Sequence, residues 1–200
     1  MAEEGEAEIP VEPEDPEYEV EEHIRFRRRQ EVLNANLQKL ISNNLSQFKQ
    51  IMDGTTYAYT QLVLKNQGIS NLTDVIEQYA HLRIIDLSLN MLKEIPNLLH
   101  LKYVTNLNLA RNQLESASFL SRDVAFPYLK SINLLGNKIE SLPAIASKNL
   151  RMINLNFNLI ANLEDFEGHP LLEVIELRGN KLKSLKGLGN LPALRELFVA

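Results

Sequence analysis

Apolar residues follow a pattern that recurs about every 22 residues over most of the chain. In each copy large aliphatic residues stand at the first, fourth, sixth and eleventh positions, and an amide stands at the ninth. The alternation around positions four to six is that of a short strand with one buried side, because successive side chains of a strand point to opposite faces. The clearest copies begin at Leu82, Val104, Leu129, Leu150 and Leu172, and a weaker copy begins at Tyr59.

The amides of successive copies lie 23, 22, 25, 21 and 22 residues apart, a regular period of the kind found in solenoids. An amide at the bend after each strand can bond backbone groups of its own and the adjacent turn, which cost ~1–3 kcal/mol each when buried without a partner. We therefore expect a ladder of amides down the stack. Its members are Gln67, which departs from asparagine as expected of a terminal copy, and Asn90, Asn112, Asn137, Asn158 and Asn180.

The pattern predicts an α/β solenoid with a parallel, concave sheet over residues 55–200, made of six full copies and the start of a seventh. The seventh copy contains Leu194, Leu197 and Val199, and its amide would fall beyond Ala200. We expect this C-terminal end to be unfinished, so that the natural protein continues or a partner covers the end.

Two segments of different character precede the repeats. Residues 1–22 hold eleven acidic and no basic side chains, interleaved with three prolines, and predict a disordered acidic tail. Such a tail either docks on a basic partner or only solvates the chain. Residues 23–54 are predicted to form an amphipathic helix over 24–52, ended by Asp53 and Gly54, that caps the N-terminal end of the stack. Its apolar residues are Leu33, Leu37, Ile41, Leu45, Phe48 and Met52.

Composition and charge exclude several classes. Without cysteine, the chain has no disulfide scaffold, no Cys-ligated metal and no thiol nucleophile. The apolar runs are short and the N-terminus is acidic, so we expect a cytoplasmic protein that does not contact the membrane. Residues 23–200 hold fifteen acidic and 21 basic side chains, a net charge of +6. The basic cluster of residues 25–29 lacks stacking aromatics, so we expect no nucleic acid.

No pattern of catalytic residues is found. The four histidines lack metal-ligand spacing, and the motifs of phosphate loops, dinucleotide folds and serine hydrolases do not occur. Asp165 and Glu167 share one loop, where solvated carboxylates are a better interpretation than an acid–base pair. We expect no enzyme, no cofactor and no metal.

The concave face is the predicted functional surface, because its side chains are those that the core does not use. Large apolar groups there, rimmed by polar ones, are typical of a protein contact. An alternative is that Leu89 and Phe157 fold back over the rim of the core. Arginines and lysines on this side can steer an acidic partner. The candidate partner-binding residues are Ile84, Asp86, Leu89, Asn108, Asn133, Leu135, Met152, Asn154, Phe157, Val174, Glu176 and Arg178.

The repeats resemble the short class of leucine-rich repeats. Within this class, residues 58–62, 81–88, 126–130, 169–173 and 177–182 are similar to a protein of the radial spokes of motile cilia. The resemblance implies a non-catalytic scaffold in the axoneme of a cilium or flagellum, in the third spoke. Its partners would be radial spoke or other axonemal subunits in a large hetero-complex.

Other functions stay open on the same residues. One alternative is a regulatory or adaptor subunit whose concave face grips an enzyme, such as a protein phosphatase or a dynein heavy chain. A third class, RNA processing, would require a nucleic-acid-binding partner, and nothing basic and aromatic in the sequence predicts one.

Overall fold

The computed structural model describes residues 16–51, 54–123 and 125–199. The chain divides into two compact units between Asn36 and Leu37, and the repeats belong to the second. The helix and strands are α1 (Pro16–Asn43), β1 (Leu45–Gln50), β2 (Tyr57–Val63), β3 (Ile84–Asp86), β4 (Asn106–Asn108), β5 (Ser131–Asn133), β6 (Met152–Asn154), β7 (Val174–Glu176) and β8 (Glu196–Phe198). Three 3₁₀ helices lie between strands: η1 (Asp74–Gln78), η2 (Pro96–His100) and η3 (Ser118–Ser121).

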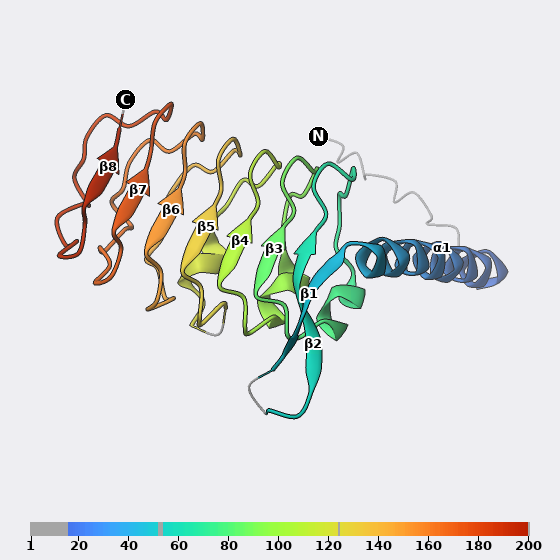
Figure 1. Cartoon of the computed structure of the whole chain (residues 1–200). Helices are drawn as coiled ribbons and strands as arrows, with labels where there is room; N and C mark the ends of the chain where they lie inside the picture. The colour runs from blue at the N-terminus through green and yellow to red at the C-terminus, as the bar shows by residue number, and fades with distance from the viewer. Residues whose placement is uncertain (1–15, 52–53, 124, 200) are drawn as a thin grey trace, which may run out of the picture. The chain divides into compact units, whose positions relative to one another are not determined.

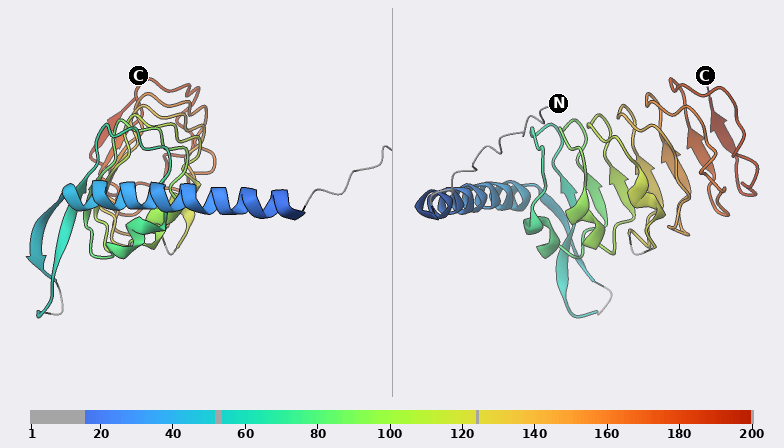
Figure 2. Two further views of the ribbon diagram at one scale, coloured as in Figure 1. Left: turned by 90° about the vertical axis from the view of Figure 1, so that its right-hand side faces the viewer. Right: turned by 180° about the vertical axis from the view of Figure 1, so that it is seen from behind.

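The described strands form one sheet of eight in sequence order, in which β2 to β8 run parallel and β1 pairs antiparallel with β2 (Figure 1). The sheet follows one side of the coil, and the 3₁₀ helices lie on another (Figure 2). This confirms the predicted solenoid with a parallel sheet. We call the outward side of the sheet, predicted to be concave, the open face.

The register explains how the core is built. The middle residue of each strand from β3 to β8 is aliphatic and aligns with its neighbours and with Leu62 near the end of β2, and the flanking residues point the other way. This column is buried from Leu62 to Ile175, whereas Leu197 in β8 is 39% exposed. Its members are Leu62, Ile85, Leu107, Ile132, Ile153, Ile175 and Leu197.

Each strand after β2 is three residues long, and in each of the six full copies the chain turns sharply just before the ladder position. The residue there has a positive φ in all six copies: Asn66, Leu89, Arg111, Gly136, Phe157 and Gly179, at 54° to 68°. This conformation costs a non-glycine residue roughly 1–2 kcal/mol. Since four of the six residues are not glycine, the packing and hydrogen bonds of the stack must offset that cost.

The far side of the coil is packed by a second apolar set, including Leu72, Leu98 and Leu120. The connection between β4 and β5 is longer than the others and places two aromatic side chains in the core. Phe119 and Phe126 are buried and meet edge to face, with ring centroids 6.4 Å apart. The extra residues of this turn therefore enlarge the core.

The N-terminal prediction needs two corrections. The helix begins at Pro16, a residue favoured in the first helical turn, so residues 16–22 of the predicted tail are helical. Residues 1–15 of that tail lie outside the described residues, as does Met52 of the predicted helix. The helix ends at Asn43, and Leu45–Gln50 form a strand instead of continuing it.

The strand is favoured because it pairs with the edge of β2, whose backbone groups would otherwise lie unpaired. The Asn44 amide donates to the carbonyl of Leu40 at 2.8 Å, which satisfies one of the last helical oxygens. Leu37 and Ile41, at the end of α1, are buried in the core next to the first turn of the coil. The apolar steps of four and three thus fit a helix only as far as Ile41.

Candidate protein-interaction surface

The open face carries two columns of side chains, one on each side of the buried column. The first column is Gln61, Ile84, Asn106, Ser131, Met152, Val174 and Glu196. The second column is Val63, Asp86, Asn108, Asn133, Asn154, Glu176 and Phe198. The structure therefore places eight of the candidate residues on one surface, and Leu89, Leu135, Phe157 and Arg178 follow the strands at its border.

The apolar candidates differ in exposure. Met152 is 43% exposed and Phe157 is 63% exposed, while Ile84, Leu89, Leu135 and Val174 are half-buried. Phe157 also packs on the next turn, because a Cβ on Gly179 would lie 2.5 Å from its Cδ1 atom. One side of the ring thus covers backbone, and much of the ring stays open to a partner.

The second column is needed by the fold, contrary to the expectation that its side chains are spare. The side-chain oxygens of Asp86, Asn108, Asn133 and Asn154 each accept the backbone N–H two residues later, at 2.9–3.1 Å. This Asx geometry supports the turn off each strand. A partner would meet only the polar atoms that the turns leave free.

Glu176 breaks this pattern at β7. Its carboxylate accepts hydrogen bonds from the side-chain amides of Asn154 at 2.9 Å and Asn156 at 2.6 Å. The Asn156 oxygen in turn accepts the backbone N–H of Arg178 at 2.7 Å, and the Arg178 guanidinium lies 4.6 Å from the centre of the Phe198 ring. Asn156 is not among the candidate residues predicted from the sequence, because the repeat pattern gives its position no role.

The amide ladder holds successive turns together. In Asn90, Asn112, Asn137, Asn158 and Asn180 the Nδ2 group donates to a carbonyl of the preceding turn and to one of its own turn, at 2.8–3.0 Å. Each Oδ1 accepts a backbone N–H of the preceding turn, at 3.0–3.1 Å. Gln67 is exposed, and its side chain bonds only the nearby carbonyl of Lys65.

An aromatic cluster on the β1–β2 hairpin was also missed. Phe48, Tyr57 and Tyr59 are 60%, 56% and 46% exposed, and the Phe48 ring centre lies 5.7 Å and 5.0 Å from the two tyrosine rings. Tyr59 was assigned to the core position of the first copy, and this is wrong. Its neighbour across the hairpin is Phe48, which was assigned to a helix, so the signal was not visible without the strand pairing.

One histidine, His169, is built into the packing of the turns. Among the described residues, no three His, Asp or Glu side chains lie close enough to share a metal ion. His169 is buried, its Nδ1 accepts the N–H of Leu171 at 3.2 Å, and its Nε2 donates to the Ser147 carbonyl at 2.9 Å. Ser147 in turn donates to the Phe126 carbonyl at 2.9 Å. These bonds link equivalent positions of three successive turns.

Replacing His169 with alanine is expected to lower the free energy of unfolding by about 2–4 kcal/mol, because it removes two buried hydrogen bonds and leaves a void. Urea denaturation followed by circular dichroism measures this. His100, whose side chain is 69% exposed, is the matched control, and His100→Ala is expected to change the value by less than about 0.5 kcal/mol. Equal effects of the two substitutions would contradict a structural role for His169.

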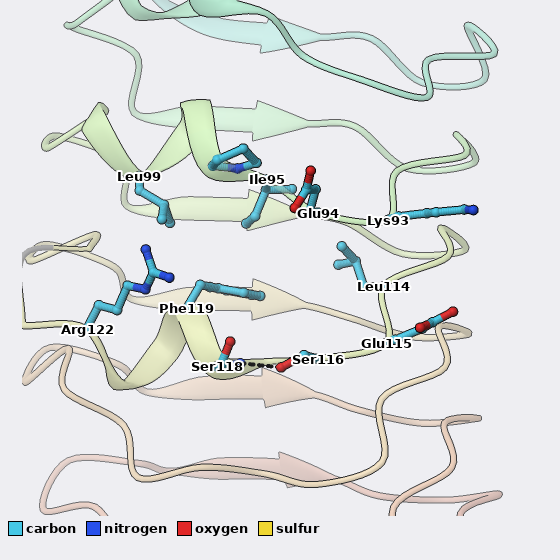
Figure 3. A pocket seen from close by; sticks show the side chains of 11 residues that line it. Lys93, Glu94, Ile95, Leu99, Leu114, Glu115, Ser116, Ser118, Phe119 and Arg122 are labelled. Atoms are coloured by element: carbon cyan, nitrogen blue, oxygen red, sulfur yellow. Dashed lines mark hydrogen bonds between the residues drawn. The ribbon is translucent and has the colours of Figure 1, made fainter. Parts of the chain in front are cut away.

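A hollow lies on the far side of the coil from the sheet. It has a volume of about 280 Å³ and lies between η2 and η3 (Figure 3). Its floor includes Ile95, Leu114 and Phe119, and charged groups such as Lys93 and Arg122 stand at its rim. Among helices of the described residues, none has the length and apolar composition needed to cross a bilayer.

Comparison with known proteins agrees with the solenoid. No family model matches the chain. Leucine-rich repeat-containing protein 23 of Bos taurus is 31% identical over 183 residues, which cover 80% of this chain and 52% of that protein. The human protein of the same name is 31% identical over 142 residues, 70% of this chain and 40% of that one. The chain thus spans about half the length of these relatives, or less.

One solved structure shows the fold. Internalin C2 of Listeria monocytogenes superposes with a TM-score of 0.52 at 16% identity, covering 71% of this chain and 80% of the internalin chain. At this identity the likeness concerns the fold alone. Together with the register and the amide ladder, it shows that the chain folds as a leucine-rich repeat solenoid, similar in sequence to leucine-rich repeat-containing protein 23.

Proposed function

We propose that this chain is a non-catalytic protein-interaction scaffold of the ciliary or flagellar axoneme, acting as a radial spoke component. The observation that carries the interaction part is the open face. Over β6 it presents Met152, with Phe157 at the border, as large exposed apolar groups beside polar side chains that the turns hold in place. Such a surface contributes binding free energy through a few apolar anchors within a polar surround.

The axonemal part has a different support. It rests on the resemblance of the quoted segments to a radial spoke protein and on the 31% identity to leucine-rich repeat-containing protein 23. The proposal assigns no reaction to the chain, and its partners are proteins of a large assembly. The choice of the third spoke rests on the resemblance alone.

Capture experiments in ciliated cells test both parts. Tagged full-length protein is expected to localise to axonemes and to co-purify with spoke subunits, and Met152→Glu is expected to reduce the recovered partner at least about tenfold, since it buries a charge in an apolar contact. Quantitative mass spectrometry of the captured proteins is the measurement.

Met91→Glu is the matched control, because Met91 is 46% exposed but lies past the turn, away from the open face. It is expected to leave capture unchanged. A diffuse or nuclear signal would refute the axonemal assignment. Recovery of an enzyme's catalytic subunit instead of spoke proteins would favour the regulatory-subunit alternative.

A further inference from the structure

A second surface lies where the chain enters the strands, at the opposite end of the sheet from the amide ladder. Three exposed or half-buried aromatic side chains from successive turns stack there in a row: His81, Tyr103 and Tyr128. Their ring centres are 5.8 Å and 6.1 Å apart, with interplanar angles of 16° and 10°. Tyr103 and Tyr128 are 41% and 51% exposed, more than buried core tyrosines would be.

A row of basic residues runs beside these rings. The row occupies the position two residues after the aromatic one in each turn. In each of these residues after the first, the backbone N–H donates to the carbonyl of the row's residue in the preceding turn, at 2.8–2.9 Å. The members of the row are Arg83, Thr105, Lys130, Arg151, Glu173 and Arg195. Four of these six residues are cationic. Lys102, directly before Tyr103, is also exposed. So is Lys148, directly before Asn149, which holds the equivalent position in the turn after Tyr128.

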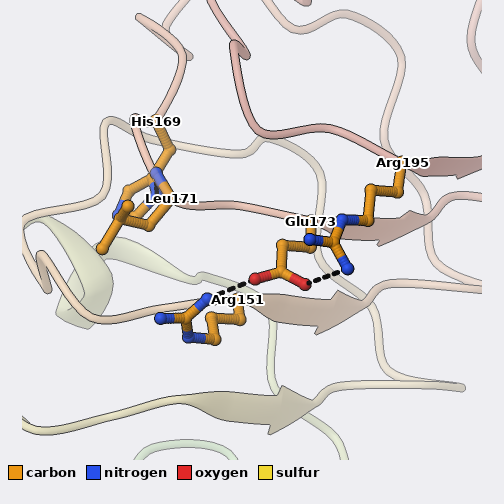
Figure 4. Close-up of polar contacts among 5 residues, drawn as sticks. All are labelled: Arg151, His169, Leu171, Glu173 and Arg195. Carbon is orange, nitrogen blue, oxygen red and sulfur yellow. Dashed lines mark hydrogen bonds and ion pairs between the residues drawn. The ribbon is translucent and has the colours of Figure 1, made fainter.

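The anionic groups at this end are few. Glu173 lies between two arginines: one oxygen contacts Arg151, and the other lies 3.6 Å from an Arg195 nitrogen (Figure 4). Its charge is thus already matched. Asp123 lines a hollow of about 380 Å³ together with Pro127, Lys148 and Asn149, next to Tyr128 in the sequence. We call the surface formed by this hollow and the two rows the basic–aromatic edge.

We propose that the basic–aromatic edge binds an acidic protein segment that also carries apolar side chains. The segment's carboxylates would pair with Lys130, Lys148 and the neighbouring cations, and its apolar groups would contact the tyrosine rings and the hollow. Charge complementarity is the reason for this choice, because the edge offers cations in excess and tyrosines are enriched in protein contacts. The inference rests on the chain being a protein-binding scaffold and adds a second site to it.

A nucleic acid fits this surface less well. Single strands bind aromatic side chains by stacking bases on free ring faces. Here the rings of His81, Tyr103 and Tyr128 are nearly parallel to their neighbours, with centres 5.8 Å and 6.1 Å apart, so a base cannot insert between neighbouring rings without spreading the row. Ring edges and hydroxyl groups can contact carboxylates and aliphatic groups without unstacking.

Nuclear magnetic resonance of the full chain with labelled tyrosines tests the proposal. The probe is a synthetic peptide of alternating glutamate and leucine, titrated at low salt. Two ligands serve for comparison: a lysine–leucine peptide, and a single-stranded oligouridine with the same net charge as the glutamate peptide. The glutamate peptide is expected to shift the ring signals of Tyr103 and Tyr128 and to leave those of Tyr57 and Tyr59 on the hairpin unchanged.

Paired charge reversals locate the binding. Lys130→Glu with Lys148→Glu is expected to weaken the peptide's Kd at least about tenfold. Lys181→Glu with Lys183→Glu changes the net charge equally at exposed residues past the ladder and is expected to weaken it less than about threefold. Tyr103→Ala is expected to lower affinity without changing its salt dependence. Thermal unfolding of each variant checks that the fold is kept.

Three results would overturn the proposal: no shift at Tyr103 and Tyr128, equal weakening by the two charge reversals, or tighter binding of the oligouridine at the same tyrosines. The last would indicate a nucleic-acid surface. None of these results depends on Met152, so failure here is distinguishable from failure of the open-face proposal, which the Met152→Glu capture experiment tests.

Discussion

Asn137→Ala is expected to lower the free energy of unfolding by about 3–5 kcal/mol, the largest effect we expect of a single ladder residue. The Asn137 side chain is buried, donates to the carbonyls of Leu109 and Leu134, and accepts the N–H of Leu114. Alanine would leave the buried N–H of Leu114 without a partner, and would leave the carbonyls of Leu109 and Leu134 with only the donations from Asn112 and Asn158. Urea denaturation followed by circular dichroism measures the change.

Two further substitutions sharpen this test. Asn71 is exposed, and Asn71→Ala is expected to change the free energy of unfolding by less than about 0.5 kcal/mol. Asn137→Asp keeps the acceptor for Leu114 but removes both donations and buries a charge, so it is expected to be at least as destabilising as alanine. If Asn137→Ala behaved like Asn71→Ala, the ladder would not be what joins the turns.

Gly168→Ala is expected to destabilise the chain by about 3–5 kcal/mol. Gly168 has a φ of 91°, and a Cβ there would lie 2.2 Å from the backbone oxygen of Asn190 in the next turn. Neither backbone can move away without breaking the bond from the His169 N–H to that oxygen, 3.0 Å long. The same denaturation measurement reports the loss.

Two other glycines separate the causes. Gly68 has a φ of 66° with nothing within 4 Å of the added carbon, so Gly68→Ala is expected to cost only about 1 kcal/mol of backbone strain. Gly189 has neither a positive φ nor a close neighbour, and Gly189→Ala is expected to have almost no effect. Similar losses at Gly168 and Gly68 would show that the turns are not packed as tightly as the structure has them.

The fold was predictable because each turn repeats the same local pattern of aliphatic and amide residues. Aliphatic residues such as Ile85 and Leu87 alternate with outward ones, and Asn90 marks the bend, so a pattern within eleven residues specifies one turn. Each copy of the turn buries its apolar side chains against the copies before and after it. The parallel sheet and its buried column follow directly from this repetition.

The N-terminal end and the second column of the open face were less predictable, because there the outcome depends on neighbouring backbone groups. Leu45 and Phe48 continue a helical spacing, but the free edge of β2 competes for the same backbone and forms a strand. Asp86 and Asn133 look like spare surface groups until the turn brings a backbone N–H to their oxygens. Such roles depend on local backbone geometry that the apolar pattern does not encode.

The stacked side chains next to the strands were also hidden in the sequence. Tyr103 and Tyr128 are 25 residues apart, and only the common register of two turns brings their rings together. The hairpin cluster around Phe48 depends in the same way on pairing between β1 and β2. Surface features of a solenoid are therefore best sought by reading equivalent positions down the stack once the register is known.

A photo-crosslinking amino acid placed at Met152 tests the central claim most directly, with the same residue placed at Met91 for comparison. If the open face is where this solenoid holds its partners, position 152 forms covalent adducts with another protein in ciliated cells and position 91 does not. Adducts at position 91 without any at position 152 would contradict it.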